Sequence, residues 1–302
     1  MPRPEHIATR TPVTRSRLVH DLRDLGLKPG IAMVHASLSA LGWVVGGSQT
    51  VVAALLDCLG PAGTLCAQAS WEDIPFGHAT WPERWRAAYE AEMPPFDPEL
   101  SAAAPYEGRV SERIRTWPGA RRSAHPGTGI AAVGASAAEL TAGHRLDDSF
   151  GVGTPYARLV EHRAQVVLLG APLRTISLLH HAEAIARAPK RWTSYRLPIA
   201  GRGWVELHEI DVWGGVYPDS PLDAIAAAAL AAGTGAEGRV GEAPAYLFPA
   251  AELTSFAVRW LERRFASAAP SASPGPSRRP AAGRSPRARA SPAGPSRRPA
   301  SS

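Results

Sequence analysis

Short apolar runs alternate with helix-like stretches along most of the chain. Four runs have the length and composition of buried strands: residues 31–35, 64–69, 130–133 and 166–169. Apolar residues at helical spacing predict helices at 14–25, 49–59, 111–117, 136–142 and 155–162. Such alternation predicts the α/β class, with a largely parallel or mixed central sheet flanked by helices.

Four further segments complete the predicted elements. Residues 71–108 form a long excursion rich in tryptophan and proline, and an insertion of this kind is more often a lid or pocket wall than filler. Residues 198–212 have the pattern of a hairpin with its turn at Gly201–Gly203. Helices are predicted at 222–232 and 251–265. We therefore expect a loop-rich and helical portion that caps a substrate.

Composition divides the chain into three parts. With 302 residues, of which 45% are hydrophobic, the chain can bury a large core. We expect a flexible N-terminus at 1–11 and one folded domain at 12–266, with 71–108 as a lid-like insertion. Residues 267–302 consist mainly of Ala, Pro, Ser, Gly and Arg and contain the segment GPSRRPA twice. Such a segment cannot bury enough apolar surface to fold, so we expect a disordered tail.

Charge is concentrated in this tail. The net charge is +6, and the tail carries seven arginines and no acidic residue, so the remainder is close to neutral. A basic tail can contact phosphates, but it lacks aromatic residues and a binding motif, so we do not expect nucleic acid as a partner. No apolar run is long enough to span a membrane, and Cys58 and Cys66 are too few for a disulfide framework. These features favour a cytoplasmic protein. We expect it to be a monomer or a homodimer.

The segment Leu178–Glu183 carries the strongest local sign of chemistry. Thr175 is predicted to cap a helix that continues to Pro189, which places His180 and Glu183 on one face. A buried carboxylate beside an imidazole fixes its tautomer and raises its basicity, as a general base requires. Such pairs are usually surface ion pairs. The apolar surroundings and the buried strand that precedes them favour a catalytic pair.

Six segments in order carry a resemblance: VHASLSALG (34–42), GG (46–47), GTL (63–65), RTWPGARRSAHP (115–126), GVGTPYARL (151–159) and LLGAPLRTISLLHHAE (168–183). Together they resemble the aminoglycoside 3-N-acetyltransferases, which are distinct from the GNAT acetyltransferases. The resemblance covers roughly residues 12–266. It implies acetyl-CoA-dependent acetylation of the 3-amino group of the 2-deoxystreptamine ring, and thereby antibiotic resistance. His180 would be the base and Glu183 its partner.

The resemblance also implies residues that bind acetyl-CoA. Taken alone, the loop after residue 35 is an ordinary connection between a strand and a helix. By family analogy the residues that contact the co-substrate are His35, Ser37, Leu38, Ser39, Leu41, Gly42, Ser123 and His125. Exposed backbone N–H groups, serine hydroxyls and the helix N-terminus that follows suit the phosphates and pantetheine of acetyl-CoA.

The acceptor would be a polycation, so its site must be rich in carboxylates. Three acidic clusters at loop positions are candidates, namely Trp71 with Glu72 and Asp73, Asp147 with Asp148, and Asp211 near Glu209. Each cluster taken alone is most often a solvated loop. After Asp211 the chain departs from the Asp-rich segment of the family, which leaves the range of acceptors open.

Two alternatives remain open. One keeps acetyl-CoA and changes the acceptor to another amine, such as an intermediate of antibiotic biosynthesis. The other is a partner- or nucleic-acid-binding protein that acts through its basic tail. No metal is expected, because His180, His181 and Glu183 lack the HExxH spacing of a zinc site and the family works without one.

Overall fold

A computed structural model of the chain describes residues 11–211 and 221–266. Most of the predicted N-terminal segment, the stretch 212–220 and the tail at 267–302 lie outside the described residues. Within the described ranges, each helix is too short or too polar to cross a lipid bilayer.

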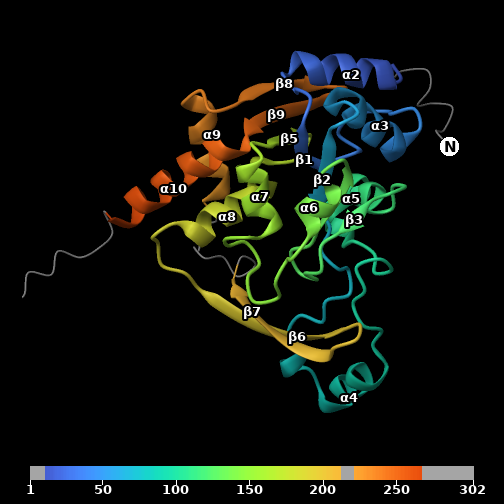
Figure 1. The fold of residues 1–302 in the computed structure, drawn as a ribbon, viewed down its shortest axis with the longest axis vertical. Coiled ribbons are helices and arrows are strands. Elements are labelled where there is room, and N and C mark those ends of the chain that lie inside the picture. The colour runs from blue at the N-terminus through green and yellow to red at the C-terminus, as the bar shows by residue number, and fades with distance from the viewer. Residues whose placement is uncertain (1–10, 212–220, 267–302) are drawn as a thin grey trace, which may run out of the picture. The chain divides into compact units, whose positions relative to one another are not determined.

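A seven-stranded mixed sheet forms the centre of the fold (Figure 1). Its strands, in spatial order, are β3 (Arg121–Arg122), β4 (Ile130–Gly134), β2 (Thr64–Gln68), β1 (Ile31–Ala36), β5 (Gln165–Leu169), β9 (Ala243–Pro249) and β8 (Ala236–Val240). Strand β1 pairs in parallel with β2 and β5, and the outer pairings are antiparallel. The parallel strands therefore bring Ala36, Gln68 and Leu169 to one edge of the sheet.

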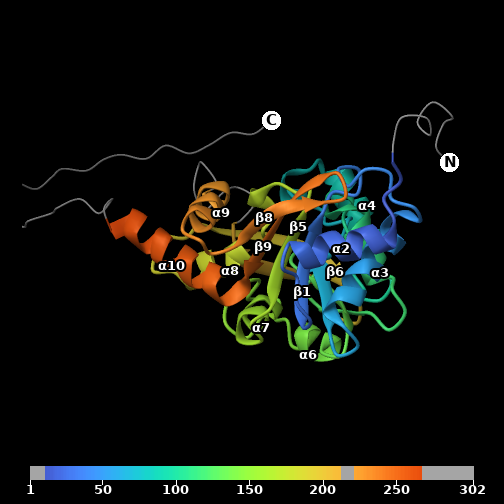
Figure 2. The ribbon, with the colours of Figure 1, turned by 90° about the horizontal axis from the view of Figure 1, so that it is seen from above.

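Helices cover both faces of the sheet (Figures 1 and 2). One face packs against α2 (Arg15–Asp24), α3 (Gly47–Leu59) and α5 (Gly108–Arg115). The other packs against α6 (Ala137–Thr141), α7 (Pro155–Glu161), α8 (Leu178–Ile185), α9 (Leu222–Ala231) and α10 (Ala250–Ala266). Side chains of a strand alternate between the faces, so Ala32 and Val34 join the first core and Met33 the second.

The excursion and the hairpin are neighbours in the fold (Figure 1). Their apolar side chains form a third cluster. The excursion contains α4 (Glu83–Glu92) and the short 3₁₀ helices η1 (His78–Thr80) and η2 (Pro105–Glu107). The hairpin consists of β6 (Trp192–Ile199) and β7 (Gly203–Ile210), with its turn where the glycines predict it. Trp71 and Phe96 of the excursion pack in this cluster with Leu197 and Leu207 of the hairpin.

Several elements differ from the prediction. Thr14 caps α2 by accepting the N–H of Arg17, as predicted, but Thr175 does not cap α8. Its hydroxyl instead donates to the Pro172 carbonyl in the 3₁₀ helix η3 (Leu173–Thr175), and α8 ends at Ile185. Strands β8 and β9 and helix α4 were not predicted. Strands β8 and β9 contain many small residues, so their apolar alternation is weak.

Candidate functional site

A cavity of about 1070 Å³ opens at the edge of the sheet where the parallel strands end. We call it the His180 cavity. Its wall includes the loop after β1, Gln68 at the end of β2, the segment after β5 and His180 of α8. The start of α5 and the turn that precedes it form another part of the wall. Segments far apart in the sequence thus surround one cavity, as is typical of ligand sites in α/β proteins.

His180 and Glu183 form a close pair in this cavity. The Nδ1 atom of His180 lies 2.6 Å from Oε2 of Glu183, as their spacing on α8 predicts. Glu183 is buried, whereas His180 retains 19% of its side-chain exposure. A carboxylate accepts only, so His180 donates its Nδ1–H and keeps the lone pair on Nε2. That geometry is the one that a general base with a fixed tautomer requires.

The neighbouring histidine, His181, makes different contacts. His181 is buried, and its Nδ1 lies 2.5 Å from the carbonyl oxygen of Phe150. The Phe150 ring in turn lies against His180, with 5.1 Å between the ring centroids, and lines the cavity. His181 therefore holds the backbone of the residue that packs on the base. The sequence did not single out Phe150.

His35, at the end of β1, is a second imidazole on the cavity wall. Burial, together with the nearby His180, lowers its pKa to about 4, so it is neutral near pH 7. Its buried Nε2 has no hydrogen-bond partner among the described residues. An unpaired polar atom beside a cavity is consistent with a site that accepts a polar ligand.

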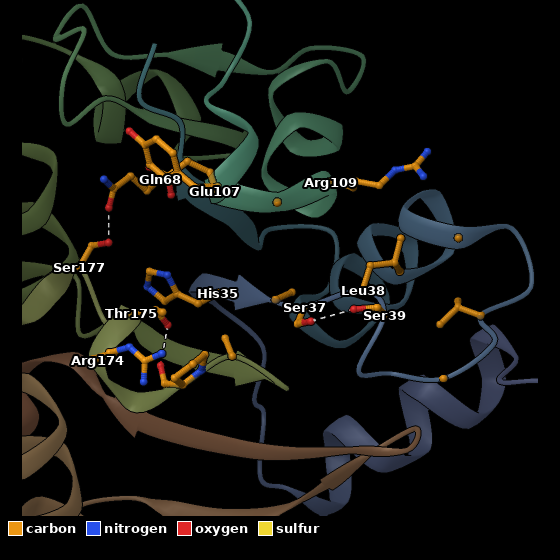
Figure 3. A pocket seen from close by; sticks show the side chains of 18 of the residues that line it. His35, Ser37, Leu38, Ser39, Gln68, Glu107, Arg109, Arg174, Thr175 and Ser177 are labelled. Atoms are coloured by element: carbon orange, nitrogen blue, oxygen red, sulfur yellow. Dashed lines mark hydrogen bonds between the residues drawn. The ribbon is translucent and has the colours of Figure 1, made fainter. Parts of the chain in front are cut away.

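The loop after β1 lines the cavity and contains backbone donors without a backbone acceptor among the described residues. Ser37 N–H donates to the Leu169 carbonyl at 2.9 Å and Ala40 N–H to the Ser37 carbonyl at 3.1 Å. The N–H groups of Leu38 and Ser39 have no backbone acceptor within the described ranges. The hydroxyls of Ser37 and Ser39 lie 3.3 Å apart beside the same cavity (Figure 3).

Helix α3 adds its N-terminus to this wall. Gly46 precedes it with φ +82°, and a Cβ there would lie 2.4 Å from Oγ1 of Thr50. Gly46 and Gly47 line the cavity, and the first turn of α3 has no acidic residue. The positive end of a 13-residue helix therefore lies at the wall, where it favours an anion.

Of the other predicted co-substrate residues, Gly42 also lines the cavity, and three residues lie elsewhere. Leu41 is fully buried in the core, where it anchors the loop. Ser123 is buried and accepts the N–H of Ile130 at 2.9 Å. His125 is buried and its Nδ1 accepts the N–H groups of Gly127 and Thr128.

Burial lowers the pKa of His125 well below its usual range, so this imidazole is neutral. Glu209, 3.5 Å away, is buried too, and burial raises its pKa. The residue that His125 supports, Thr128, does line the His180 cavity. Ser123 and His125 therefore shape the turn that forms part of the wall.

The predicted acidic clusters do not line the His180 cavity. Asp147 is exposed and pairs with Arg145 at 2.6 Å, and Asp148 accepts the N–H of Gly151 at 2.6 Å. Asp211 lies 3.7 Å from Arg191, next to the segment that the structure does not describe. Negative charge and a loop position in the sequence therefore do not predict which carboxylates lie near His180.

Trp71, Glu72 and Asp73 line a second cavity of about 950 Å³, which we call the Trp71 cavity. It shares no lining residue with the His180 cavity among those described. Its wall carries four carboxylates and three large aromatic side chains, namely Glu72, Asp73, Glu92, Asp97, Trp71, Trp81 and Tyr89.

The residues of the His180 cavity that the sequence did not single out include Gln68, Tyr106, Glu107, Arg109, Thr128, Phe150, Arg174 and Ser177. Gln68 had a signal, because it is a polar residue at the carboxyl end of an otherwise buried strand. Arg109 and Arg174 are exposed and stand on different sides of the cavity (Figure 3). Arg174 lies 3.8 Å from Asp223. Nothing local distinguished the two arginines from ordinary surface residues.

Comparisons with known proteins agree with this fold over most of the chain. Residues 33–262 match the family model described as aminoglycoside 3-N-acetyltransferase. The chain is 46% identical over 266 residues to aminoglycoside N(3)-acetyltransferase IX of Micromonospora chalcea, and the match covers 84% of this chain and 95% of that protein.

Two solved structures agree over nearly their full length. AAC-IIIb in a binary complex with CoASH has a TM-score of 0.78 and 41% identity, covering 84% of this chain and 98% of that one. AAC-VIa bound to sisomicin has a TM-score of 0.77 and 39% identity, covering 84% of this chain and 99% of that one. The chain belongs to the aminoglycoside 3-N-acetyltransferase family.

Proposed function

We propose that this protein transfers the acetyl group of acetyl-CoA to the 3-amino group of the 2-deoxystreptamine ring of aminoglycosides, and so confers resistance. The observation that carries the proposal is the His180–Glu183 pair in a cavity lined by backbone donors and a helix N-terminus. The relatives bound to CoASH and to sisomicin support both substrates.

His180 acts as the general base. An ammonium has no lone pair, so the attacking nitrogen must first lose a proton. Nε2 of His180 takes this proton, because Nδ1 is engaged by Glu183 at 2.6 Å. Glu183 stabilises the imidazolium that forms, as a buried carboxylate beside a histidine does. General-base catalysis of this kind contributes typically about 10²- to 10⁴-fold.

The cavity is assigned to acetyl-CoA, whose thioester carbonyl the amine attacks. Collapse of the tetrahedral adduct breaks the C–S bond and releases CoA as a thiol, which takes up the proton that His180 removed from the amine. The wall combines the N-terminus of α3 with the exposed guanidinium groups of Arg109 and Arg174, and all three favour phosphates. His35, Ser37, Leu38, Ser39 and Gly42 line the same cavity and are the proposed co-substrate contacts. The unpaired Nε2 of His35 is consistent with this assignment.

Charge that develops on the carbonyl oxygen requires donors that are already in place. The N–H groups of Leu38 and Ser39 are the candidates, since those of Ser37 and Ala40 already donate within the protein.

The outer part of the acceptor is assigned to the Trp71 cavity. Aromatic side chains cover sugar faces, and carboxylates attract ammonium groups, so its composition suits an aminosugar. Trp71, Glu72 and Asp73 are the proposed contacts there. Each carboxylate of Asp147, Asp148 and Asp211 has a partner within the protein. We therefore propose that these residues attract the cationic acceptor through long-range electrostatics and do not contact it directly.

Expression in a sensitive bacterium tests the proposal. We expect the inhibitory concentrations of gentamicin, kanamycin, neomycin or apramycin to rise for at least one drug, and the His180→Ala variant to abolish the rise. If the wild-type protein shifts none of the four, the acceptor is another amine.

A further inference from the structure

Glu107 provides a carboxylate on the wall of the His180 cavity. Among the described residues that line this cavity, it is the single acidic one. The other carboxylate nearby, Glu183, is buried behind His180 and is engaged with it. An amine acceptor that reaches His180 therefore meets Glu107 as the one negative side chain of the described wall.

The backbone holds Glu107 firmly at this place. It is the last residue of η2, and the next residue, Gly108, has φ +85°. A Cβ on Gly108 would lie 3.2 Å from the carbonyl oxygen of Ala36, the last residue of β1. The close approach and the left-handed conformation both favour glycine, and they fix Glu107 against the end of the strand that carries His35.

A chain of hydrogen bonds connects Glu107 with the start of the His180 helix. Ser177, the residue before α8, donates its hydroxyl to Oε1 of Gln68. Gln68 donates its amide to Oγ of Ser70 at 3.1 Å, and Ser70 donates to Oε1 of Glu107 at 2.8 Å. Figure 3 shows the first of these bonds and places Glu107 beside Gln68. Every donor in the chain points toward the carboxylate.

Glu107 nevertheless lacks a cation. No Lys, Arg or His of the described residues lies within ion-pair distance of it. The guanidinium of Arg122 is directed to the carbonyls of Ala69 and Ser101. Burial raises the pKa of this carboxylate to about 7, although the hydrogen bond from Ser70 and the nearby charge of Arg122 lower it. A bound ammonium would supply the missing partner and favour the charged form.

We propose that Glu107 binds an ammonium group of the acceptor, adjacent to the amine that His180 deprotonates, and so contributes to the affinity for the acceptor. The proposal rests on the proposed function. The ammonium is a neighbouring one, because the attacking nitrogen must give up its proton to His180. Glu107 is therefore a residue that determines specificity for acceptors with at least two amino groups.

The substitution Glu107→Gln keeps an oxygen that can accept from Ser70 and removes only the charge. Its matched control is Glu237→Gln, an exposed glutamate on β8 that does not line the cavity. Steady-state kinetics with kanamycin would give KM and kcat, and calorimetry would give the Kd for CoA. We expect Glu107→Gln to raise the KM for kanamycin at least tenfold, with kcat and the Kd for CoA within threefold. The control should change none of them.

The split between KM and kcat separates binding from a structural role. A loss confined to kcat at saturating kanamycin would mean that Glu107 only orders Gln68 and Ser177, and would overturn the proposal. An unchanged KM, or an equal weakening of CoA binding, would overturn it too. Glu107→Asp retains the charge on a side chain that is one methylene shorter. Its KM for kanamycin is therefore expected to lie between those of the wild type and Glu107→Gln.

A measurement on the unmodified protein covers the case in which the variants fail to fold. At pH 6 Glu107 is mostly protonated and the amines of kanamycin are mostly charged. Binding of kanamycin should then release close to one proton, measured by calorimetry in two buffers of different ionisation enthalpy. No release would contradict the proposal. If the wild-type protein binds kanamycin with proton release but acetylates no aminoglycoside, the proposed function fails and Glu107 remains a site for ammonium groups.

Discussion

Oε2 of Glu183 lies 2.6 Å from Nδ1 of His180, one helical turn earlier on α8. The pair is three residues apart in the sequence, so the helix itself sets the contact. Glu183 is buried and His180 faces the cavity. The protein therefore shields the carboxylate of Glu183 from water. The cavity gives access to the imidazole.

The Glu183→Gln variant tests this contact. An amide no longer provides a charged acceptor for Nδ1–H, and charge-assisted hydrogen bonds are worth about 1.5–3 kcal/mol. We expect kcat to fall about 10- to 150-fold, with little change in the KM for acetyl-CoA. The surface pair of His162 and Glu139, at 2.9 Å, provides the control. Glu139→Gln should leave turnover unchanged, and a similar loss in both variants would refute a specific role for Glu183.

Stability should depend on pH through Glu107. Its pKa is about 7 in the folded protein and near 4.5 in the unfolded chain. Between these values the folded state binds more protons, so stability falls as pH rises through this window. The melting temperature of Glu107→Gln, measured relative to wild type, should therefore increase from pH 4.5 to about 7 and level off above. A difference that stays constant with pH would contradict the raised pKa.

Asp73 should matter less than Glu107. Asp73 is exposed at the Trp71 cavity. Exposed ion pairs contribute about 0.2–1 kcal/mol, which is at most about fivefold in affinity. We expect Asp73→Asn to raise the KM for aminoglycosides about two- to fivefold and to leave the KM for acetyl-CoA unchanged. A larger effect on acetyl-CoA would reverse the assignment of the two cavities.

Removal of residues 267–302 tests whether the basic tail takes part in the reaction. The family match ends at residue 262, before the seven arginines of the tail. We expect the protein truncated after Ala266 to keep its kcat and both KM values within twofold. Salt-sensitive DNA binding that disappears with the tail, together with unchanged turnover, would show a separate activity of the tail.

The parts that were predictable are those set by local spacing. The contact between His180 and Glu183 follows from helical geometry. The role of the loop at 37–42 came from the family resemblance, because its position after a buried strand is equally typical of an ordinary connection. The strands β1, β2 and β5 were predicted because apolar runs of this length reflect burial on both sides. Their parallel arrangement brings the predicted base and the predicted loop to one cavity.

Local spacing did not predict which carboxylate lines the His180 cavity. Glu107 lies in the excursion, without any periodic pattern around it, and its place depends on contacts with Ser70 and with the end of β1. Asp147 looked equally suitable in the sequence, yet it pairs with Arg145 two residues away. Which loop carboxylate reaches the base is decided by tertiary packing, which charge patterns do not encode.

The most direct test of the account is the position of the acetyl group on the product. Purified protein is incubated with acetyl-CoA and kanamycin or gentamicin, and the product is analysed by mass spectrometry and NMR. The account predicts a single acetyl group on the 3-amino nitrogen of 2-deoxystreptamine, and a loss of about 10²-fold or more in rate for His180→Ala, which should still bind CoA. Acetylation at another nitrogen, or near-normal turnover by His180→Ala, would contradict it.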